Sequence, residues 1–255
     1  MKIIQITDLH IGLEDDDTHS VDVRRNFLKI LKEAQKRHPD YLVLTGDLCL
    51  MDGNLEIYQW IKVHLDASNI PYEVISGNHD DSKILAEAFH KTADLHGTEF
   101  FFKKRLGNKT CLFLDTAAGE MSSNQLLWLG KELRELQQSV VIFMHHPPVK
   151  GGVVFMENKH VMRGREQIQS ILCNYDYPIT IFCGHYHVEK TICQQNLTVH
   201  ITPSTYVQID DAAENFVVDH YRIALREITF EPYAVLSTVR YFNGKKLKSQ
   251  ISGIS

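Results

Sequence analysis

The feature that most constrains the fold of this chain is a series of short apolar segments, each followed by polar residues. These segments are rich in β-branched and aromatic residues and read KIIQIT, YLVLTGD, YEVISGNHD, TCLFLDT, VVIFMHHPP, TIFCGHYH and LTVHITPS. A strand with one solvated face alternates polar and apolar residues, and these segments are too uniformly apolar for that. They therefore predict strands that are covered on both faces.

Helical patterns lie between these segments, over residues 21–37, 55–68, 82–89, 124–137 and 165–173. The alternation of strand and helix predicts βα units and a layered α/β fold. Near the C-terminus, the runs TVHITPSTYVQI, HYRIALREI and YAVLSTVRYF alternate in polarity, which predicts antiparallel strands joined by short turns. No linker, repeat or low-complexity tract divides the chain, so we expect a single domain over residues 1–255.

The charge balance argues against a nucleic-acid polymer as the partner. The chain carries 27 basic and 32 acidic side chains, for a formal net charge of -5. No surplus of positive charge is available to neutralise a run of backbone phosphates. On an acidic protein, bound metal ions can instead supply the positive charge that a small phosphate ester needs.

The cysteines and the N-terminus indicate a cytoplasmic protein. The five cysteines form no CxxC pair, and most of them lie within apolar runs, as buried reduced thiols do. The N-terminal sequence MKIIQITDLH begins a strand at once and lacks the apolar stretch of a signal peptide or a membrane span. We therefore expect neither secretion nor attachment to a membrane.

Polar motifs stand where five of the apolar segments end. They are Asp8-Leu9-His10, Gly46-Asp47, Gly77-Asn78-His79-Asp80, His145-His146-Pro147 and Gly184-His185-Tyr186-His187. In layered α/β folds the carboxyl ends of strands converge on one crevice, so these motifs can meet there. Alternate residues of an extended segment point the same way, which predicts that Asp8 pairs with His10 and His185 with His187. The glycines allow sharp turns or close approach just before a ligand.

The side chains in these motifs form a set of candidate metal ligands without thiolates. Carboxylate, imidazole and amide ligands suit manganese, iron or zinc better than a structural zinc cage. The seven candidates are Asp8, His10, Asp47, Asn78, His145, His185 and His187. Because seven ligands are too many for one tetrahedral ion, one carboxylate must bridge two ions. Asp47 is the natural bridge, since its motif has no second ligand, and the remaining ligands divide into Asp8, His10, His187 and Asn78, His145, His185.

Each motif alone has an ordinary structural explanation. A single histidine in a chain with 14 of them is usually a surface or core residue, and Gly-Asp at a strand end is usually a turn. The GNHD motif is more specific, because average residue usage yields it by chance in about one chain in a thousand of this length. The occurrence of all five motifs at strand ends favours a metal site.

In their order and spacing, the motifs resemble those of the calcineurin-like metallophosphoesterases: D-x-H, G-D, G-N-H-[DE], H and G-H-x-H. The resemblance covers residues 6–187. It implies a four-layer α/β/β/α sandwich, in which two mixed sheets pack face to face with helices outside, and a dinuclear metal site at the strand ends. It also implies that His145 is the ligand of the HHP motif and that His146 lies behind the ligands.

Within that family, the chain is most similar to class III cyclic nucleotide phosphodiesterases of the bacterial CpdA type. The shared features are the QITDLH opening, the NQLLWLGKEL segment before HHPP, and TPSTYVQI after GHYH. One departure concerns the loop after HHPP, which commonly ends in leucine-arginine-asparagine in that subfamily. Here the loop reads Val161-Met162-Arg163-Gly164, which leaves the substrate open.

The resemblance suggests hydrolysis in which two cations bind the phosphate oxygens and lower the pKa of a bridging water. The resulting hydroxide is the expected nucleophile, and His79 is expected to protonate the leaving sugar oxygen. Asp80 either orients His79 or caps the helix that begins near residue 82. Residues 150–163 are expected to form a loop beside the site, in which His160 and Arg163 either contact the substrate or are merely solvated.

Three functions remain open at this point. The first is hydrolysis of a 3',5'-cyclic nucleotide such as cyclic AMP to the 5'-monophosphate. The second is hydrolysis of another small phosphodiester, a nucleotide pyrophosphate or a phosphomonoester. The third is a scaffold without catalysis, which the complete set of candidate ligands disfavours. A homodimer is also expected, because twofold assemblies are common.

Overall fold

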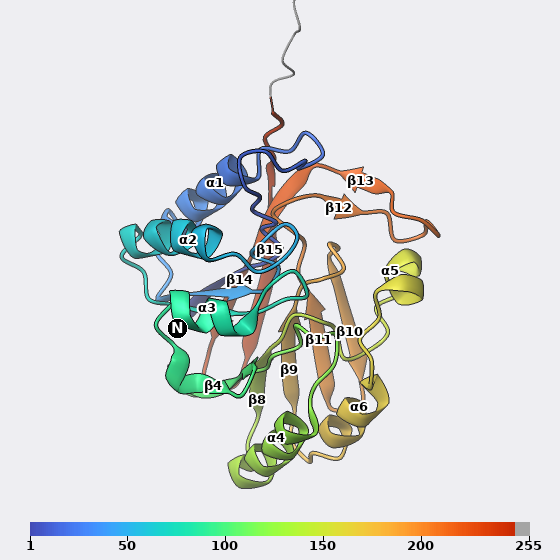
Figure 1. The fold of residues 1–255 in the computed structure, drawn as a ribbon. Helices are drawn as coiled ribbons and strands as arrows, with labels where there is room; N and C mark the ends of the chain where they lie inside the picture. The colour runs from blue at the N-terminus through green and yellow to red at the C-terminus, as the bar shows by residue number, and fades with distance from the viewer. Residues whose placement is uncertain (248–255) are drawn as a thin grey trace, which may run out of the picture.

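The computed structural model describes residues 1–247 of the chain. Two mixed β-sheets pack against each other, and helices cover the outer side of each sheet (Figure 1). This arrangement is the expected four-layer α/β/β/α sandwich. No helix within the described residues is both long enough and apolar enough to span a membrane. The extent of a single domain over residues 1–255 stays a prediction.

The first sheet combines three parallel strands with an antiparallel pair. Its strands are β1 (Lys2–Ile6), β2 (Tyr41–Thr45), β3 (Tyr72–Ile75), β14 (Arg222–Phe230) and β15 (Val235–Asn243), in the order β15-β14-β1-β2-β3. The helices on its side of the molecule are α1 (Val23–Gln35), α2 (Leu55–Ala67) and α3 (Ser82–Ala88). Side chains of Asp22, Asn54 and Asp81 cap their N-termini by accepting backbone N–H bonds, which explains where each helix begins.

The second sheet is longer and carries an antiparallel strand at each edge. Its strands are β6 (Phe102–Leu106), β7 (Lys109–Phe113), β8 (Val140–Phe143), β9 (Ile179–Cys183), β10 (Lys190–Gln194) and β11 (Leu197–Ile201), in the order β10-β11-β9-β8-β7-β6. Helices α4 (Ser123–Leu136) and α6 (Arg165–Cys173) cover its outer side. Two small hairpins complete the fold: β4 (Leu95–His96) with β5 (Glu99–Phe100), and β12 (Gln208–Ile209) with β13 (Val218–His220).

Strand β8, in the middle of the second sheet, is buried on both faces, as its apolar sequence predicts. In β8, Val141 and Phe143 pack into the core that contains the first sheet, whereas Val140 and Ile142 pack into the core under α4 and α6. A ladder of stacked rings crosses strands β6 to β9, with neighbouring centroids 4.5, 5.1 and 5.6 Å apart; its members are Phe102, Phe113, Phe143 and Phe182. Because both faces are apolar, polar side chains gather at the strand ends.

The predicted helices are all present, with ends within two residues of the predicted ones. Two of the three C-terminal runs form antiparallel strands, as predicted, in β14 and β15. The prediction is wrong in part for the first run, because its strand β11 pairs parallel with β9 on one side and antiparallel with β10 on the other. The prediction of a loop over residues 150–163 is wrong in its middle part, where α5 (Val154–Lys159) forms. A helix of six residues is too short to show a clear apolar period, which explains the error.

Candidate metal centre

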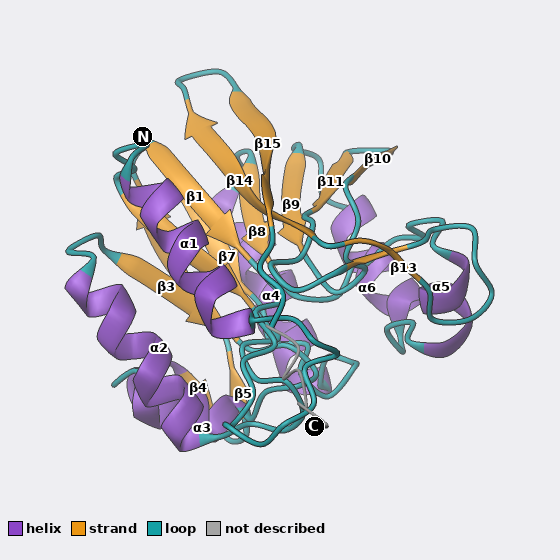
Figure 2. Cartoon of the chain, turned by 90° about the horizontal axis from the view of Figure 1, so that it is seen from above, coloured by secondary structure: helices purple, strands orange, loops and turns teal. Residues whose placement is uncertain are grey.

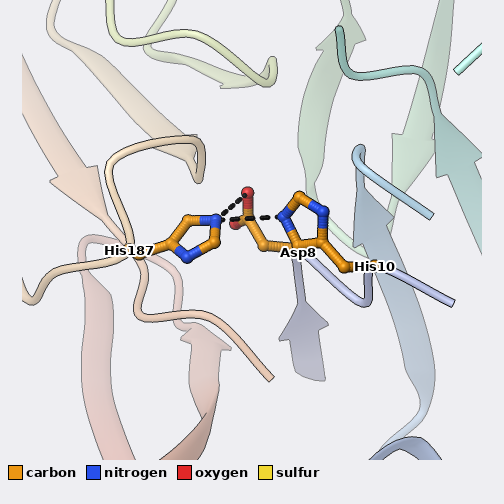
Figure 3. Close-up of side chains that lie close together, drawn as sticks. All are labelled: Asp8, His10 and His187. Carbon is orange, nitrogen blue, oxygen red and sulfur yellow. Dashed lines mark hydrogen bonds and ion pairs between the residues drawn. The ribbon is translucent and has the colours of Figure 1, made fainter. Parts of the chain in front are cut away.

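The five polar motifs meet at the carboxyl ends of β1, β2, β3, β8 and β9. Three groups of side chains each offer ligand atoms within 4.8 Å of one another: Asp8 with His10 and His187, His10 with Asp47 and His79, and Asp47 with His145 and His185. Figure 3 shows the first group, in which His187 and His10 face each other beside Asp8. The remaining candidate ligand, Asn78, lines the same cavity as His10 and Asp47.

Asp47 contacts members of both proposed ligand sets. One of its carboxylate oxygens, Oδ2, lies 3.2 Å from His145 Nε2 and 3.7 Å from His10 Nε2. Asp8 Oδ1 lies 3.3 Å from His187 Nε2 and 3.9 Å from His145 Nε2. All of these side chains are buried. Both carboxylates therefore face histidines of the two sets, and the assignment of Asp47 as the bridge stays a prediction.

The backbone of the ligand segments is not extended, contrary to the expectation from the sequence. Five candidate ligands have positive φ angles: Asp8 at 54°, His10 at 47°, Asp47 at 50°, His185 at 66° and His187 at 52°. The left-handed conformation costs roughly 1–2 kcal/mol for each non-glycine residue. Such strain concentrates at functional sites, where surrounding contacts enforce it. Asp8 and His10 nevertheless share a group, whereas His185 and His187 belong to different ones.

Two glycines allow other segments to approach the carboxylates closely, as expected. A Cβ atom on Gly77 would lie 2.3 Å from Asp47 Oδ1, and one on Gly184 would lie 2.4 Å from Asp8 Oδ2. In the native chain the backbone N–H of His185 instead donates to Asp8 Oδ1 over 3.1 Å. Glycine is therefore required here for space.

Hydrogen bonds determine which ring nitrogen of each histidine is free for a metal. Nδ1 of His145 lies 2.8 Å from the Thr45 carbonyl oxygen, and Nδ1 of His187 lies 2.9 Å from that of Val207. A carbonyl only accepts, so both Nδ1 atoms carry a proton, and Nε2 is the nitrogen of each ring that could bind a metal in place of a proton. His185 has the opposite arrangement, because its Nε2 donates to the His160 carbonyl oxygen over 2.8 Å and leaves Nδ1 free.

The free nitrogens and the local charges fit bound cations. Nε2 of His145 is buried without a hydrogen-bond partner among the described residues. Nε2 of His10 and Nε2 of His187 lie 3.1 Å apart, an arrangement that a metal ion between them would satisfy.

The pKa shifts agree with this conclusion. Burial lowers the pKa of His10 and of His185 to about 3, so both rings are neutral and able to coordinate. Burial also disfavours the charged form of His145, but the facing Asp47 and Asp8 carboxylates outweigh it and raise its pKa to about 9. Without a metal, the carboxylates thus attract a proton to His145. A bound cation would take the place of that proton.

His79 is held by contacts that differ from those expected. Its Nδ1 lies 3.0 Å from the Met51 carbonyl oxygen, and its backbone N–H donates to Asp47 Oδ1 over 2.9 Å. The Met51 carbonyl therefore orients the ring. Both roles considered for Asp80 are wrong, because its carboxylate contacts neither the His79 ring nor the first turn of α3, which Asp81 caps.

The Asp80 carboxylate instead ties two ligand segments together. It accepts hydrogen bonds from the backbone N–H groups of Leu48, Cys49 and Gly77 and from the Tyr58 hydroxyl, over 2.9–3.2 Å. Burial, together with the Asp47 charge, raises the pKa of Asp80 to about 6. Since Leu48 follows Asp47 and Gly77 precedes Asn78, Asp80 sets the spacing of these two candidate ligands.

The two residues predicted to contact substrate lie in different surroundings. His160 lines a cavity of about 280 Å³ beside the candidate ligands, and its carbonyl group holds His185. Arg163 does not line this cavity, because its guanidinium group pairs with Glu120 at 3.1 Å and donates to the Ala118 carbonyl oxygen over 2.7 Å. His146 does not line this cavity and packs against the candidate ligand His185, with ring centroids 4.1 Å apart.

Sequence reasoning missed several residues around the site. The cavity has an apolar wall formed by Leu50, Met51, Phe155, Met156, Tyr206, Ile209 and Phe216. Within this wall, Met51 is 65% exposed. Ser204 and Thr205 donate from their hydroxyls to the Asp8 carbonyl oxygen over 2.9 and 3.2 Å. These residues belong to no motif, so the sequence offers no signal for them.

Two packed mixed sheets, with aspartates and histidines converging at the strand ends, define the class of metal-dependent phosphoester hydrolases. A family model described as calcineurin-like phosphoesterase matches residues 1–189. The chain belongs to this family. The expected family and enzyme class are thereby confirmed.

Curated relatives cover most of the chain. A probable cyclic nucleotide phosphodiesterase of Fibrobacter succinogenes is 36% identical over 210 residues, which are 82% of each chain. A probable glycerophosphodiester phosphodiesterase GpdQ of Arcobacter nitrofigilis is 28% identical and covers 91% of this chain and 90% of its own. The 3',5'-cyclic adenosine monophosphate phosphodiesterase CpdA of Escherichia coli K12 is 25% identical, over 93% of this chain and 88% of its own.

The fold is also that of a solved dimetal phosphatase from Danio rerio. The TM-score is 0.73, and the match covers 94% of this chain and 96% of the other at 12% identity. The expected fold class is confirmed.

Proposed function

We propose that this protein is a metal-dependent phosphodiesterase that hydrolyses a 3',5'-cyclic nucleotide, cyclic AMP in the first instance, to the 5'-monophosphate. The observation that carries the proposal is a single cavity of about 280 Å³ whose lining includes both candidate metal ligands and apolar and aromatic side chains. A phosphate ester with a flat apolar group attached suits a lining of both kinds. Similarity to relatives named as cyclic nucleotide phosphodiesterases supports the same substrate class.

Two metal ions, manganese, iron or zinc, are proposed for the centre. Asp47 would be shared, with Asp8, His10 and His187 at one ion and Asn78, His145 and His185 at the other. When bound, such ions bring positive charge to the phosphate oxygens and make a water molecule acidic enough to attack phosphorus. The carbonyls of Thr45, Val207 and His160 keep the ligand nitrogens aimed inward.

His79 is proposed to donate the proton to the leaving sugar oxygen. Its ring lies at the edge of the cluster, with its centroid 5.1 Å from that of His10, and it lines the substrate cavity. Nδ1 is engaged by the Met51 carbonyl, so Nε2 is the atom available for proton transfer. A sugar alkoxide is a poor leaving group and needs this proton, whereas p-nitrophenolate leaves without it.

The test uses manganese-loaded protein with cyclic AMP, cyclic GMP, bis(p-nitrophenyl) phosphate, p-nitrophenyl phosphate and a glycerophosphodiester. Cyclic nucleotides should have the highest kcat/KM. His79→Ala should keep its metals and slow cyclic AMP hydrolysis by about 10²- to 10⁴-fold, with a much smaller loss on bis(p-nitrophenyl) phosphate. Equal losses on both substrates would show that His79 binds phosphate or metal instead.

A second candidate substrate is a glycerophosphodiester. It is favoured by the similarity to the Arcobacter nitrofigilis relative over most of both chains. The same panel separates the two, because the preferred substrate shows the higher kcat/KM.

We also propose that the protein is located in the cytoplasm. Its expected partner is a small phosphoester substrate, and neither a nucleic-acid polymer nor a membrane. All five cysteines, which lie within residues 1–247, are free thiols in the structure, as a reducing compartment maintains them. A homodimer stays a prediction, which sedimentation of the purified protein would test.

A further inference from the structure

Two aromatic side chains from separate segments meet at the cavity beside the metal centre. Phe155 lies on α5, and Phe216 lies in the loop between β12 and β13. Their ring centroids are 5.9 Å apart, with an angle of 63° between the ring planes. Both rings line the cavity that contains His10, Asp47 and His79.

The two segments are fixed to each other and to the metal centre. The backbone N–H of Val154 donates to the Asp211 carbonyl oxygen over 3.0 Å, which joins α5 to the β12–β13 hairpin. Figures 1 and 2 both show α5 beside this hairpin. At the other end of α5, the His160 ring packs on Phe155 at 5.0 Å, while the His160 carbonyl holds the ligand His185. The rings therefore keep a set position relative to the ligands.

The exposure of Phe216 and of the residue next to it indicates a surface that a bound molecule would cover. Phe216 is 46% exposed and its neighbour Val217 is 45% exposed. Exposed apolar area beside a polar site marks a binding surface. The occupant shares the cavity with the phosphate, so it is part of the same small molecule. A glycerol group would press hydroxyls against these rings without partners, which costs free energy, whereas a flat heterocycle can stack on them.

We propose that Phe155 and Phe216 form a base-recognition wall, on which the nucleobase of the substrate stacks while its phosphate lies at the metal centre. This inference rests on the proposed function for the placement of the phosphate. It goes further by assigning substrate selection to two residues outside the metal-binding motifs. The wall discriminates nucleotides from phosphodiesters that lack a base.

The experiment measures binding, by calorimetry on manganese-loaded protein, of adenosine 5'-monophosphate and of ribose 5-phosphate, which lacks only the base. Phe155→Ala and Phe216→Ala should each weaken binding of the monophosphate by about 10- to 100-fold, the usual loss for one base-stacking ring. Binding of ribose 5-phosphate should change less than about twofold. Phe155→Leu and Phe216→Leu keep apolar volume without a flat ring, and should lose most of the same affinity.

The matched control is Tyr233→Ala. Tyr233 is a fully exposed aromatic residue in the turn between β14 and β15. This turn lies near Met1, whose carbonyl oxygen accepts the backbone N–H of Phe230, so it is at the amino end of β1, whereas the candidate ligands lie at the carboxyl ends of the strands. The Tyr233→Ala variant should bind adenosine 5'-monophosphate and ribose 5-phosphate as the unchanged protein does.

Equal losses for the two ligands, or no loss for the monophosphate, would overturn the base-recognition wall. If the leucine variants bind the monophosphate with full affinity, the wall does not recognise the base by stacking, and that part of the proposal is overturned. The proposed function fails separately, if the unchanged protein does not hydrolyse cyclic nucleotides. In that case a base-dependent loss in the alanine variants would still support the wall, with a different nucleotide as substrate.

Discussion

Substitution of Gly184 by alanine tests the packing of the metal centre with the addition of a single methyl group. A Cβ atom at this position would lie 2.1 Å from Thr7 Oγ1 and 2.4 Å from Asp8 Oδ2. Ordinary contact begins at 3.4 Å, so these oxygens would have to retreat by about 1.3 and 1.0 Å. Neither can move freely, because Thr7 Oγ1 donates to the Thr45 carbonyl oxygen and Asp8 faces His187 at 3.3 Å.

A displacement of about 1 Å at a catalytic group typically costs on the order of 10²-fold in rate. Gly184→Ala should therefore lower kcat/KM by about 100-fold or more and reduce the metal content. Overpacking of a buried site should also destabilise the fold by about 1–3 kcal/mol. Metal analysis, steady-state kinetics and denaturant unfolding measure the three effects.

Gly130→Ala is the matched control. Gly130 lies inside α4, where the nearest atom to an added Cβ is Arg134 Nη1 at 3.4 Å. Alanine should stabilise this helix by about 0.5–1 kcal/mol and leave activity unchanged. If Gly184→Ala keeps normal metal content and turnover, Asp8 does not hold a metal in the position described, and the argument from close approach is refuted.

Three further predictions concern the ligand sets and a surface ion pair. Chelation of the metals should abolish turnover. Asp47→Ala should be the most damaging change among the candidate ligands, since it weakens both metal sites. Metal analysis that finds full activity with a single ion per chain would contradict a bridging Asp47. Asn78→Ala should lose mainly one metal and His10→Ala mainly the other, so metal analysis that finds the same site emptied in both would disprove the division. Burial raises the pKa of Glu227, but its hydrogen bonds with two arginines outweigh burial and hold the pKa below 4.5. Glu227→Gln should therefore destabilise the folded protein by up to about 1 kcal/mol at pH 7. The difference in stability between the two proteins should vanish as the pH falls through that lowered pKa. Thermal melts that show the same difference in melting temperature at pH 7 and at pH 2 would count against this prediction.

Much of the fold follows from the sequence because local patterns and burial agree. Strands such as β8 read as continuous apolar runs since one face packs on the other sheet and one on helices. The helices begin after capping residues such as Asp22 and Asn54. Strands β6 and β10 were not predicted, because both are edge strands whose polar residues interrupt the apolar pattern.

The conformation of the ligand segments is less predictable. The pattern of Asp8 and His10 predicts an extended segment, yet both residues have positive φ angles. This conformation is uncommon even for aspartate and histidine, which adopt it more often than most other non-glycine residues. It is imposed by hydrogen bonds between segments, such as that from the backbone N–H of His10 to the Asp47 carbonyl oxygen over 3.0 Å. Those partners are 37 residues apart in the chain.

The sequence by itself determined the types of candidate ligand, their order along the chain and their place at strand ends, because each motif directly follows a short apolar run rich in β-branched residues, which predicts a strand. Only the tertiary structure decided which nitrogen of each histidine is free, what Asp80 holds, and which apolar side chains line the cavity. These properties depend on backbone carbonyls and amides and on side chains such as Phe155 and Phe216, which come from distant segments. Backbone groups are the same in every residue, so their pairing leaves no mark on the sequence.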